Sequence, residues 1–529
     1  MCNAAELIDL NDVPYAEARC VREKECLPGT RESLLREICD VLNDPAEDAP
    51  RVCLLTGVAG SGKSAVAHSI ARLYDGQKRL ASSYCFTSTD VKNRNPRNLF
   101  STIARDLCDH DPQYKSALWG IVKDNRALRT STSPLEQLER FIVEPNKELD
   151  SVGPQLVVII DALDESGDRG NRRVILEAIS KQIADNALPT NIRFLITARP
   201  ESDILAKLPS GPHLVHKQMG DISAEIVDGD IERFIHHSLD ENSSDLALSS
   251  AKEQWCRVLV CRSQQLFQWA ATACKFIQED GVNPRKQPDL LLQSEGNASV
   301  RPLDQLYQAI LDQLFPSDNT RQSFQDVMAV ILALHEPLSL ASLSVLFYSN
   351  EDLDVRFIIK RMGSLLDGVL DEEKPIRPLH ASFRDFLLDE ARSSTFHVRI
   401  LPRHSLSLGR ALLACMRDKL RFNICGLKDS RERNATVSDL DNRVKLAIPP
   451  HLSYSCRHWM DHLQHTECTP ELLKEIACFF KDFFPYWLEA ISLLSRMFQV
   501  SPILSAQVAC TILSEWAKVC TITMIFVEY

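Results

Sequence analysis

The spacing of hydrophobic positions changes along this 529-residue chain and divides it into two parts. In the first part, short apolar runs rich in β-branched residues alternate with stretches whose apolar positions recur every three or four residues. The apolar runs cover residues 51–57, 81–86, 155–165 and 192–200, and the helical stretches include 28–44, 64–74, 96–108 and 172–184. Because buried strands that alternate with helices form parallel sheets covered on both faces, we predict an α/β fold here.

From about residue 221 onward the helical period dominates. Residues 230–239, 264–277 and 303–315 have helical spacing, and a polar, proline-containing stretch at 281–302 is typical of a linker. Short helices and a hairpin expected over 336–389 predict a winged helix, and the remaining sequence is helical and rich in aromatic residues. The predicted fold class is therefore an α/β domain followed by all-helical and winged-helix domains.

Composition narrows the function classes. A formal net charge of −12 argues against a nucleic-acid partner and against a polybasic membrane protein. The 17 cysteines contain no C-x-x-C pair, and the N-terminus is too acidic and broken for a secretory signal. No apolar run approaches the length of a membrane span. We expect a soluble cytoplasmic protein with reduced thiols.

A phosphate-binding loop is predicted between the first apolar run and the helix after it. The stretch "GVAGSGKS" matches the pattern G-x-x-x-x-G-K-[ST], in which glycines let backbone N–H groups surround phosphate oxygens. Lys63 is suited to the β- and γ-phosphates, and the hydroxyl of Ser64 is suited to Mg²⁺. The predicted nucleotide-binding residues of this loop are Gly57, Gly60, Ser61, Gly62, Lys63, Ser64 and Ala65. The site therefore takes ATP or ADP, with GTP as an alternative, together with Mg²⁺.

Two further signals follow at later strand ends. Asp161 ends the apolar run "LVVIID", where a carboxylate can hold Mg²⁺ through a water molecule. Asp164 and Glu165 lie just beyond it and can position an attacking water, although a solvated acidic loop is the alternative. Arg199 follows the run "IRFLITA", where its guanidinium could sense the γ-phosphate. These three residues are the predicted catalytic residues.

The motifs "GVAGSGKS", "VVIIDALDE" and "FLITARP", in this order, resemble the NACHT subclass of signal-transduction ATPases with numerous domains. The closest similarity is to the nephrocystin-like N-terminal NTPase domain, which is abundant in basidiomycete fungi. Later segments resemble the same proteins: "CLPGTRESLLREI", "LFQWAATACKFI", "RPLHASFRDFLLD", "FNICGL" and "LSYSCRHWMDHL". The resemblance covers roughly residues 26–500, with Gln265 standing where relatives commonly have a small residue.

This resemblance implies two further nucleotide contacts. The first segment in such proteins lies against the base and ribose, which assigns Arg31 to the nucleotide. The winged-helix segment carries a histidine that contacts the β-phosphate of ADP, which assigns His380. From the local pattern alone, His380 is instead a core residue packed beside Phe383 and Phe386.

The resemblance also sets the domain boundaries that we expect. They are an N-terminal tail at 1–27, the NTPase domain at 28–218, a helical domain at 219–300, a winged-helix domain at 301–395 and a C-terminal helical region at 396–529. Relatives usually carry a repeat sensor downstream and many begin with an effector domain, so either both are missing from this sequence or the protein works without them.

Two functions from different classes fit these signals. The first is a regulatory switch that is closed with ADP, opens and self-associates with ATP, and hydrolyses ATP slowly. The second is a turnover P-loop NTPase or phosphotransferase, for which the same loop is suitable. The long helical part favours the switch, since a phosphotransferase needs an acceptor pocket and a lid. Neither the trigger nor the effector partner can be read from the sequence.

Other groups of cysteine, histidine and aromatic residues could either bind a ligand or serve only packing. Zinc could bind to a cysteine- and histidine-rich stretch with the residues Cys456, His458, His462, His465 and Cys468. We favour an amphipathic helix there, with Trp459 and Leu463 inward and the histidines solvated, because the spacing fits no closed zinc pattern. Four other cysteines, Cys256, Cys261, Cys415 and Cys425, are interpreted as small buried hydrophobes. The aromatic stretch "CFFKDFFPYW" is interpreted as helical core or as a packing face toward a missing domain, with an exposed partner surface as the alternative.

Overall fold

The computed structural model describes most of the chain. The described residues are 10, 13–16, 18–20, 24–87, 96–147, 155–241, 250–278, 301–347, 354–428, 434, 437, 439–463, 466 and 469–497. The predicted linker at 281–302 lies almost wholly outside them. Contacts divide the chain into two compact units. The first unit holds residues 1–310 and 380–385, and the second unit holds residues 311–379 and 386–529.

A five-stranded parallel sheet forms the centre of the first unit, with strand order β2-β3-β4-β1-β5. The strands are β1 (Val52–Thr56), β2 (Leu80–Cys85), β3 (Leu156–Asp161), β4 (Ile192–Ala198) and β5 (Leu214–Gln218). The α/β prediction is confirmed, and four of the strands lie where the apolar runs predicted them. The fifth strand, β5, was not predicted. It is an edge strand whose residues are mostly only partly buried, so it lacks an apolar run.

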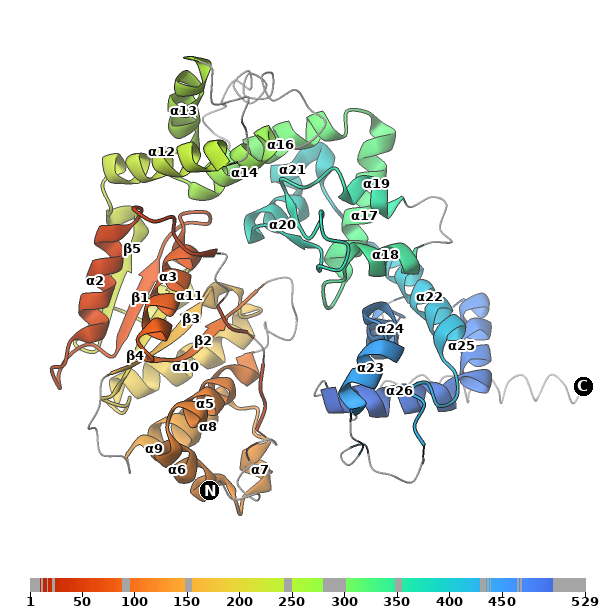
Figure 1. Cartoon of the computed structure of the whole chain (residues 1–529), viewed down its shortest axis with the longest axis horizontal. Coiled ribbons are helices and arrows are strands. Elements are labelled where there is room, and N and C mark those ends of the chain that lie inside the picture. Colours follow the sequence, from red (N-terminus) through yellow and green to blue (C-terminus); the bar gives the residue numbers. More distant parts are fainter. Residues whose placement is uncertain are drawn as a thin grey trace, which may run out of the picture. The chain divides into compact units, whose positions relative to one another are not determined.

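Helices cover both faces of this sheet (Figure 1). The helices in this part of the chain are α2 (Glu32–Asn43), α3 (Lys63–Gly76), α5 (Leu99–His110), α6 (Pro112–Val122), α7 (Arg126–Arg129), α8 (Pro134–Gln137), α9 (Glu144–Lys147), α10 (Arg169–Ala184) and α11 (Ser202–Lys207). Alternate strand residues face opposite sides, as the two-residue period of a strand requires. Cys53 and Leu55 pack in one core with α2 and α3, while Val52 and Leu54 pack in a second core with α5 and α10.

Further helices of the first unit follow the sheet in sequence. They are α12 (Ala224–Glu241), α13 (Ser250–Ser263), α14 (Phe267–Ile277) and α16 (Pro302–Leu314), whose last residues pass into the second unit. The described part of the expected tail at 1–27 also belongs to the core. Val13, Ala16 and Ala18 are buried in it, so this segment differs from the free tail that we expected.

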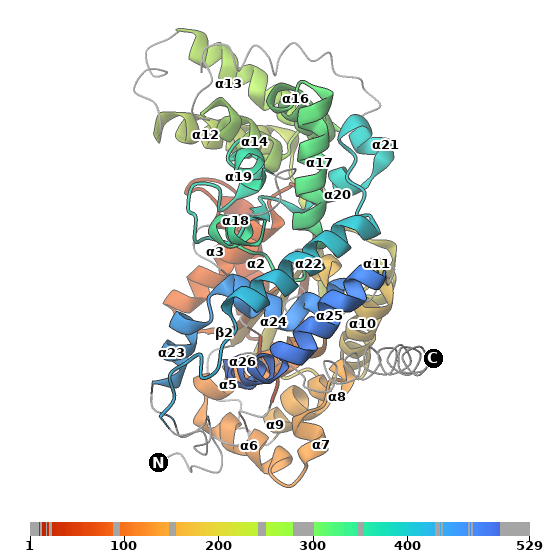
Figure 2. The ribbon, with the colours of Figure 1, turned by 90° about the vertical axis from the view of Figure 1, so that its right-hand side faces the viewer.

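The second unit is helical apart from one short hairpin. Its elements are α17 (Asp318–Ala333), α18 (Leu340–Leu346), α19 (Val355–Ile359), β6 (Leu366–Asp367), β7 (Arg377–Pro378), α21 (Glu390–Ser393), α22 (Pro402–Lys419), α23 (Leu440–Ala447), α24 (Pro450–Leu463), α25 (Pro470–Asp482) and α26 (Phe484–Met497). The antiparallel pair β6–β7 is the expected hairpin. Figure 2 shows α22 lying along α24 and α25, with which it is in contact.

Helix α20 (Ala381–Leu388) connects the units, since its first residues group with the first unit and its last residues with the second. None of the described helices is both long and apolar enough to cross a membrane. The domain boundaries that we expected stay predictions.

Candidate nucleotide-binding site

The predicted phosphate-binding loop connects the end of β1 to the start of α3. Gly60 and Gly62 have φ angles of 82° and 99°, in the left-handed region that favours glycine. A Cβ on Gly60 would also lie 2.8 Å from the Cβ of Gln268, whose backbone N–H donates to the carbonyl of Gly60. The loop therefore has the backbone of a P-loop, and glycine is required where α14 approaches it.

Lys63 begins α3 and turns back onto the loop. Its Nζ donates to the carbonyl oxygens of Gly57 at 2.8 Å and of Val58 at 3.0 Å. Burial lowers the pKa of Lys63, against the opposing effect of the Asp164 charge. The structure thus places a shielded ammonium group against the loop, with Ser64 next to it in the first turn of the helix.

Asp161 ends β3 and is 3% exposed. The hydroxyl of Thr197 donates to its Oδ1 at 2.5 Å and accepts from the backbone N–H of Ala162 at 3.0 Å. Thr197 lies on β4, which separates β3 from β1 in the sheet. A neighbouring strand thus fixes this carboxylate at the edge where the P-loop begins, as a Mg²⁺ ligand would require.

The three predicted catalytic residues meet at the same edge. Nε of Arg199 lies 3.0 Å from Asp164, and the backbone N–H of Arg199 donates to the same carboxylate at 2.9 Å. Glu165 is 4.0 Å from the guanidinium, and Asp385 of α20 binds its other side at 2.7 Å. Burial alone would lower the pKa of Arg199, but the hydrogen bond and charge of Asp385 raise it. Arg199 therefore bridges the acidic loop and α20.

Arg31 is buried beside the P-loop with part of its guanidinium unsatisfied. Its Nη2 donates to the carbonyl of Ser61 at 3.0 Å, and the guanidinium lies 4.9 Å from the ring centroid of Phe267. Its backbone N–H donates to Asp230 at 2.9 Å. Within the part of the chain that the structure describes, Nε and Nη1 of Arg31 are buried without a hydrogen-bond partner. Because buried donors without acceptors are costly, this cation fits an anionic or polar ligand.

His380 groups with the first unit, unlike the residues before it. Its Nδ1 accepts from the backbone N–H of Ser382 at 3.1 Å and lies 2.7 Å from the hydroxyl of Ser382. Burial, together with the charges of Arg199 and Lys63, lowers the pKa of His380 to about 4. At neutral pH the ring is therefore uncharged, and with Nδ1 as acceptor its proton is on Nε2. His380 is partly exposed, whereas Phe383 and Phe386 are fully buried.

The structure thus brings together residues that are far apart in sequence. An ion pair links Asp164 to Arg199, and the charge of Asp164 also acts on Lys63 of the P-loop. The charges of Arg199 and Lys63 act in turn on His380. Sequence reasoning missed three participants, Thr197, Phe267 and Asp385. None of them carries a local signal, since threonine in a strand, phenylalanine at a helix start and an acidic residue in an amphipathic helix are all common.

The cysteine- and histidine-rich stretch is part of the helix α24. Trp459 and Leu463 point inward as expected, but the prediction of solvated histidines is wrong. His462 is 4% exposed and bonds to the hydroxyl of Tyr454 at 2.7 Å, and His458 is partly buried. The buried side of α24 is wider than its aliphatic residues indicate, because aromatic and imidazole rings pack against one another there. His465 and Cys468 lie outside the described residues.

The remaining cysteines and aromatic residues follow the packing prediction, with one exception. Cys256, Cys415 and Cys425 are buried, but Cys261 is exposed on the outer side of α13. Phe479 and Trp487 of the aromatic stretch are buried, and both rings contact Trp459 edge-on. That stretch is helical core of the second unit, as predicted.

Comparison with known proteins supports the prediction that the first part of the chain is an NTPase domain. Residues 29–199 match the family model described as Nephrocystin 3, N-terminal, which confirms the nephrocystin-like part of the resemblance. These residues run from just before Arg31 to Arg199 and so contain the P-loop and the acidic loop. No curated protein matches the sequence.

Two solved structures are similar in part. The "Structure of Drosophila ORC bound to DNA" has 12% identity and a TM-score of 0.28, covering 64% of this chain and 75% of that one. The "Structure of Drosophila ORC bound to poly(dA/dT) DNA and Cdc6 (conformation 1)" has 12% identity and a TM-score of 0.22, covering 88% and 69%. With TM-scores this low, neither similarity carries an argument about this chain. The α/β P-loop fold rests on the sheet and the loop themselves.

Proposed function

We propose that the protein is a nucleotide-dependent regulatory switch of the NACHT type, closed with ADP and open and self-associating with ATP. The proposal rests on residues 380–385. They group with the first unit, although the residues before and after them belong to the second unit. A segment between two stretches of the second unit thus supplies Asp385 to Arg199, and supplies His380 within the electrostatic reach of Lys63.

The residues present fit a nucleotide with Mg²⁺. Lys63 and the N–H groups of the P-loop would hold the terminal phosphates, and Ser64 and Asp161 would hold the metal. Arg31 has two N–H groups, at Nε and Nη1, that could donate hydrogen bonds to the nucleoside or to a phosphate of the nucleotide. Bound ATP would supply the phosphoanhydride bond that is hydrolysed and the γ-phosphate that distinguishes it from ADP.

The acidic loop favours slow hydrolysis in this conformation. Asp164 accepts a hydrogen bond from the backbone N–H of Arg199 at one oxygen, and its other oxygen is ion-paired with the Nε of Arg199. A carboxylate fixed by these contacts is less available to orient an attacking water. Glu165, 4.0 Å from the guanidinium, is the second carboxylate that could orient water. Slow hydrolysis suits a switch better than a turnover enzyme.

The test is the nucleotide released from the purified chain on denaturation. The proposal expects close to one equivalent of ADP per chain, retained through gel filtration. An empty site that cycles ATP rapidly would instead support a turnover NTPase. Competition of GTP against ATP for the emptied site decides between the two bases.

A further inference from the structure

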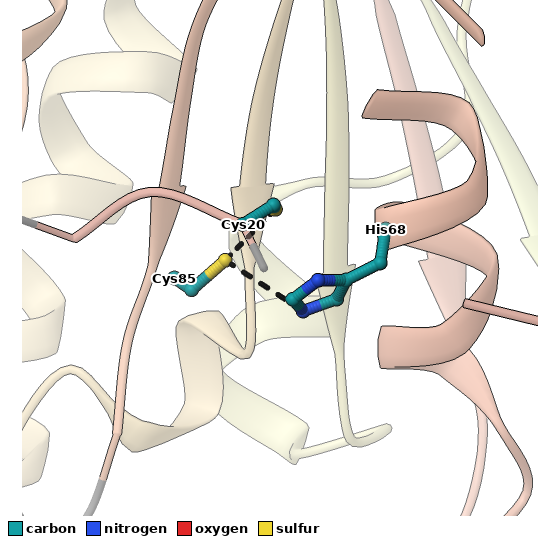
Figure 3. Close-up of side chains that lie close together, drawn as sticks. All are labelled: Cys20, His68 and Cys85. Atoms are coloured by element: carbon teal, nitrogen blue, oxygen red, sulfur yellow. Dashed lines mark hydrogen bonds between the residues drawn. The ribbon is translucent and has the colours of Figure 1, made fainter. Parts of the chain in front are cut away.

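We propose that Cys20, His68 and Cys85 form a binding site for a thiophilic divalent cation, best fitted by zinc. The three residues come from the N-terminal segment, α3 and the end of β2, and their side chains converge (Figure 3). The two sulfur atoms are 2.9 Å apart, and Sγ of Cys85 lies 4.0 Å from Nε2 of His68. All three potential ligand atoms lie within 4.8 Å of one another.

The donor set determines the class of metal. Thiolate and imidazole are ligands of zinc and other thiophilic ions, whereas Mg²⁺ prefers the oxygen donors predicted at Ser64 and Asp161. With Zn–S bonds of about 2.3 Å, two thiolates on a tetrahedral zinc lie about 3.8 Å apart, and a thiolate and an imidazole about 3.6 Å apart. The sulfur atoms must therefore separate by about 0.9 Å, and His68 must approach by about 0.4 Å. Three protein ligands would leave one position open.

The backbone holds two of these residues close while leaving one adjustable. The N–H of Cys85 donates to the carbonyl of Ala18 at 2.7 Å, and the N–H of Cys20 donates to the hydroxyl of Ser83 at 3.0 Å. The segment around Cys20 is thereby fastened along β2, the edge strand of the sheet. A rotation about the Cα–Cβ bond of Cys20 would bring its sulfur to zinc without a change in this backbone.

A disulfide between the two cysteines is the competing use of the pair. It would use the two sulfur atoms alone, whereas the imidazole of His68 also lies within reach of them from a separate element. It would also require an oxidant such as a peroxide. The observations therefore favour the metal.

A metal here would connect the P-loop helix to the edge of the sheet. His68 lies on α3 shortly after Lys63, and Cys85 stands in register with Asp161 on β3. A metal that binds the folded chain and not the unfolded chain would stabilise the fold, as any ligand of the native state does. This site is separate from the nucleotide phosphates, so its existence does not depend on the proposed switch.

The experiment uses the full chain, reduced and freed of metal with a chelator. Zinc is added in competition with a chromophoric chelator, and cysteines are then alkylated with iodoacetamide and mapped by mass spectrometry. We expect one equivalent of zinc to slow alkylation of both Cys20 and Cys85 at least tenfold. Cys39, another partly buried cysteine of the same unit, should be alkylated at an unchanged rate.

Variants then test the ligands individually. Cys85→Ser and His68→Gln should each weaken zinc binding at least about 10- to 100-fold, since even groups that only support a ligand contribute this much. Cys39→Ser should bind zinc like the wild type. Unprotected cysteines, full binding by Cys85→Ser, or a Cys20–Cys85 disulfide that persists under reduction would overturn the proposal. If a variant does not fold, protection in the wild type decides the question alone.

Discussion

Lys63 is the only cationic side chain in the loop "GVAGSGKS", and its ammonium rests on the carbonyl oxygens of Gly57 and Val58. We expect Lys63→Ala to abolish nucleotide retention, because the phosphates lose the point charge beside the loop amides. The measurement is the nucleotide content of the purified variant after denaturation. Lys207→Ala, which removes an exposed lysine of α11, is the control and should retain nucleotide. A Lys63→Ala protein with full nucleotide content would move the site elsewhere.

The two carboxylates of the acidic loop differ in how they are held. Glu165→Gln should preserve ATP binding and slow single-turnover hydrolysis about 10²–10⁴-fold, as expected on losing a group that positions water. Asp164→Asn should slow hydrolysis less, because Asp164 is already engaged by Arg199. Asp185→Asn, at the exposed end of α10, is the control. Unchanged hydrolysis in both loop variants would remove their catalytic assignment.

His380 makes the folding stability of the first unit depend on pH, and the sign of this dependence follows from its lowered pKa. The unfolded chain takes up the proton near pH 6.5, whereas the folded chain resists it until about pH 4. The stability supplied by the neutral ring is therefore complete above pH 6.5 and is lost progressively as the pH falls toward 4. The charges that act on the ring are those of Arg199, Lys63, Lys24 and Asp385.

This dependence is measured by urea unfolding of wild type and His380→Asn between pH 7.5 and 4.5. Wild type should lose stability more steeply than the variant over this range. His462 also has a lowered pKa, about 3, but it is present in both proteins and cancels in the comparison. Parallel curves would show that His380 is accessible to protons in the folded chain.

At the scale of elements, the sequence predicts what depends on local pattern. The ends of β1, β3 and β4 could be predicted, because each strand is an apolar run that leads into a recognisable polar feature. These features are the P-loop after β1, Asp161 at the end of β3 and Arg199 after β4. Strand β5 could not, since an edge strand containing His216 and Lys217 has no such run. The contact between Arg199 and Asp385 spans 186 positions, and no local period encodes it.

The α20 contact can be tested separately from the histidine. Asp385→Asn removes the charge that holds the outer side of Arg199, with both side chains partly exposed. An ion pair of this exposure contributes about 0.2–1 kcal/mol, so ADP release should become roughly 1.5- to 5-fold faster. The measurement is the dissociation rate of a fluorescent ADP analogue. Asp371→Asn, in the exposed turn after the hairpin strand β6, is the control, because asparagine keeps the oxygen that accepts from the backbone N–H of Glu373. An unchanged rate would restrict Asp385 to a structural role.

At the scale of the whole molecule, a switch requires that the nucleotide interact differently with two conformations. The segment at 380–385 is where this difference can arise, because the chain passes there from the second unit into the first and back. The Nε2–H of the neutral His380 is suited to donate to a terminal phosphate oxygen of ADP. If the proposed switch is correct, the same position would crowd a γ-phosphate, and ADP and ATP would have opposite effects on closure.

The last prediction therefore concerns His380→Leu, which keeps most of the bulk and removes the donor. A hydrogen bond to a charged group contributes about 1.5–3 kcal/mol, so ADP release should accelerate about 10- to 100-fold and the open, associating form should become favoured. ADP dissociation rates and sedimentation with ATP measure both effects in the same preparations. His380→Gln, which keeps an N–H donor, should lie between wild type and the leucine variant. If a folded His380→Leu protein releases ADP at the wild-type rate, the histidine is a packing residue and the closed form is held by other contacts.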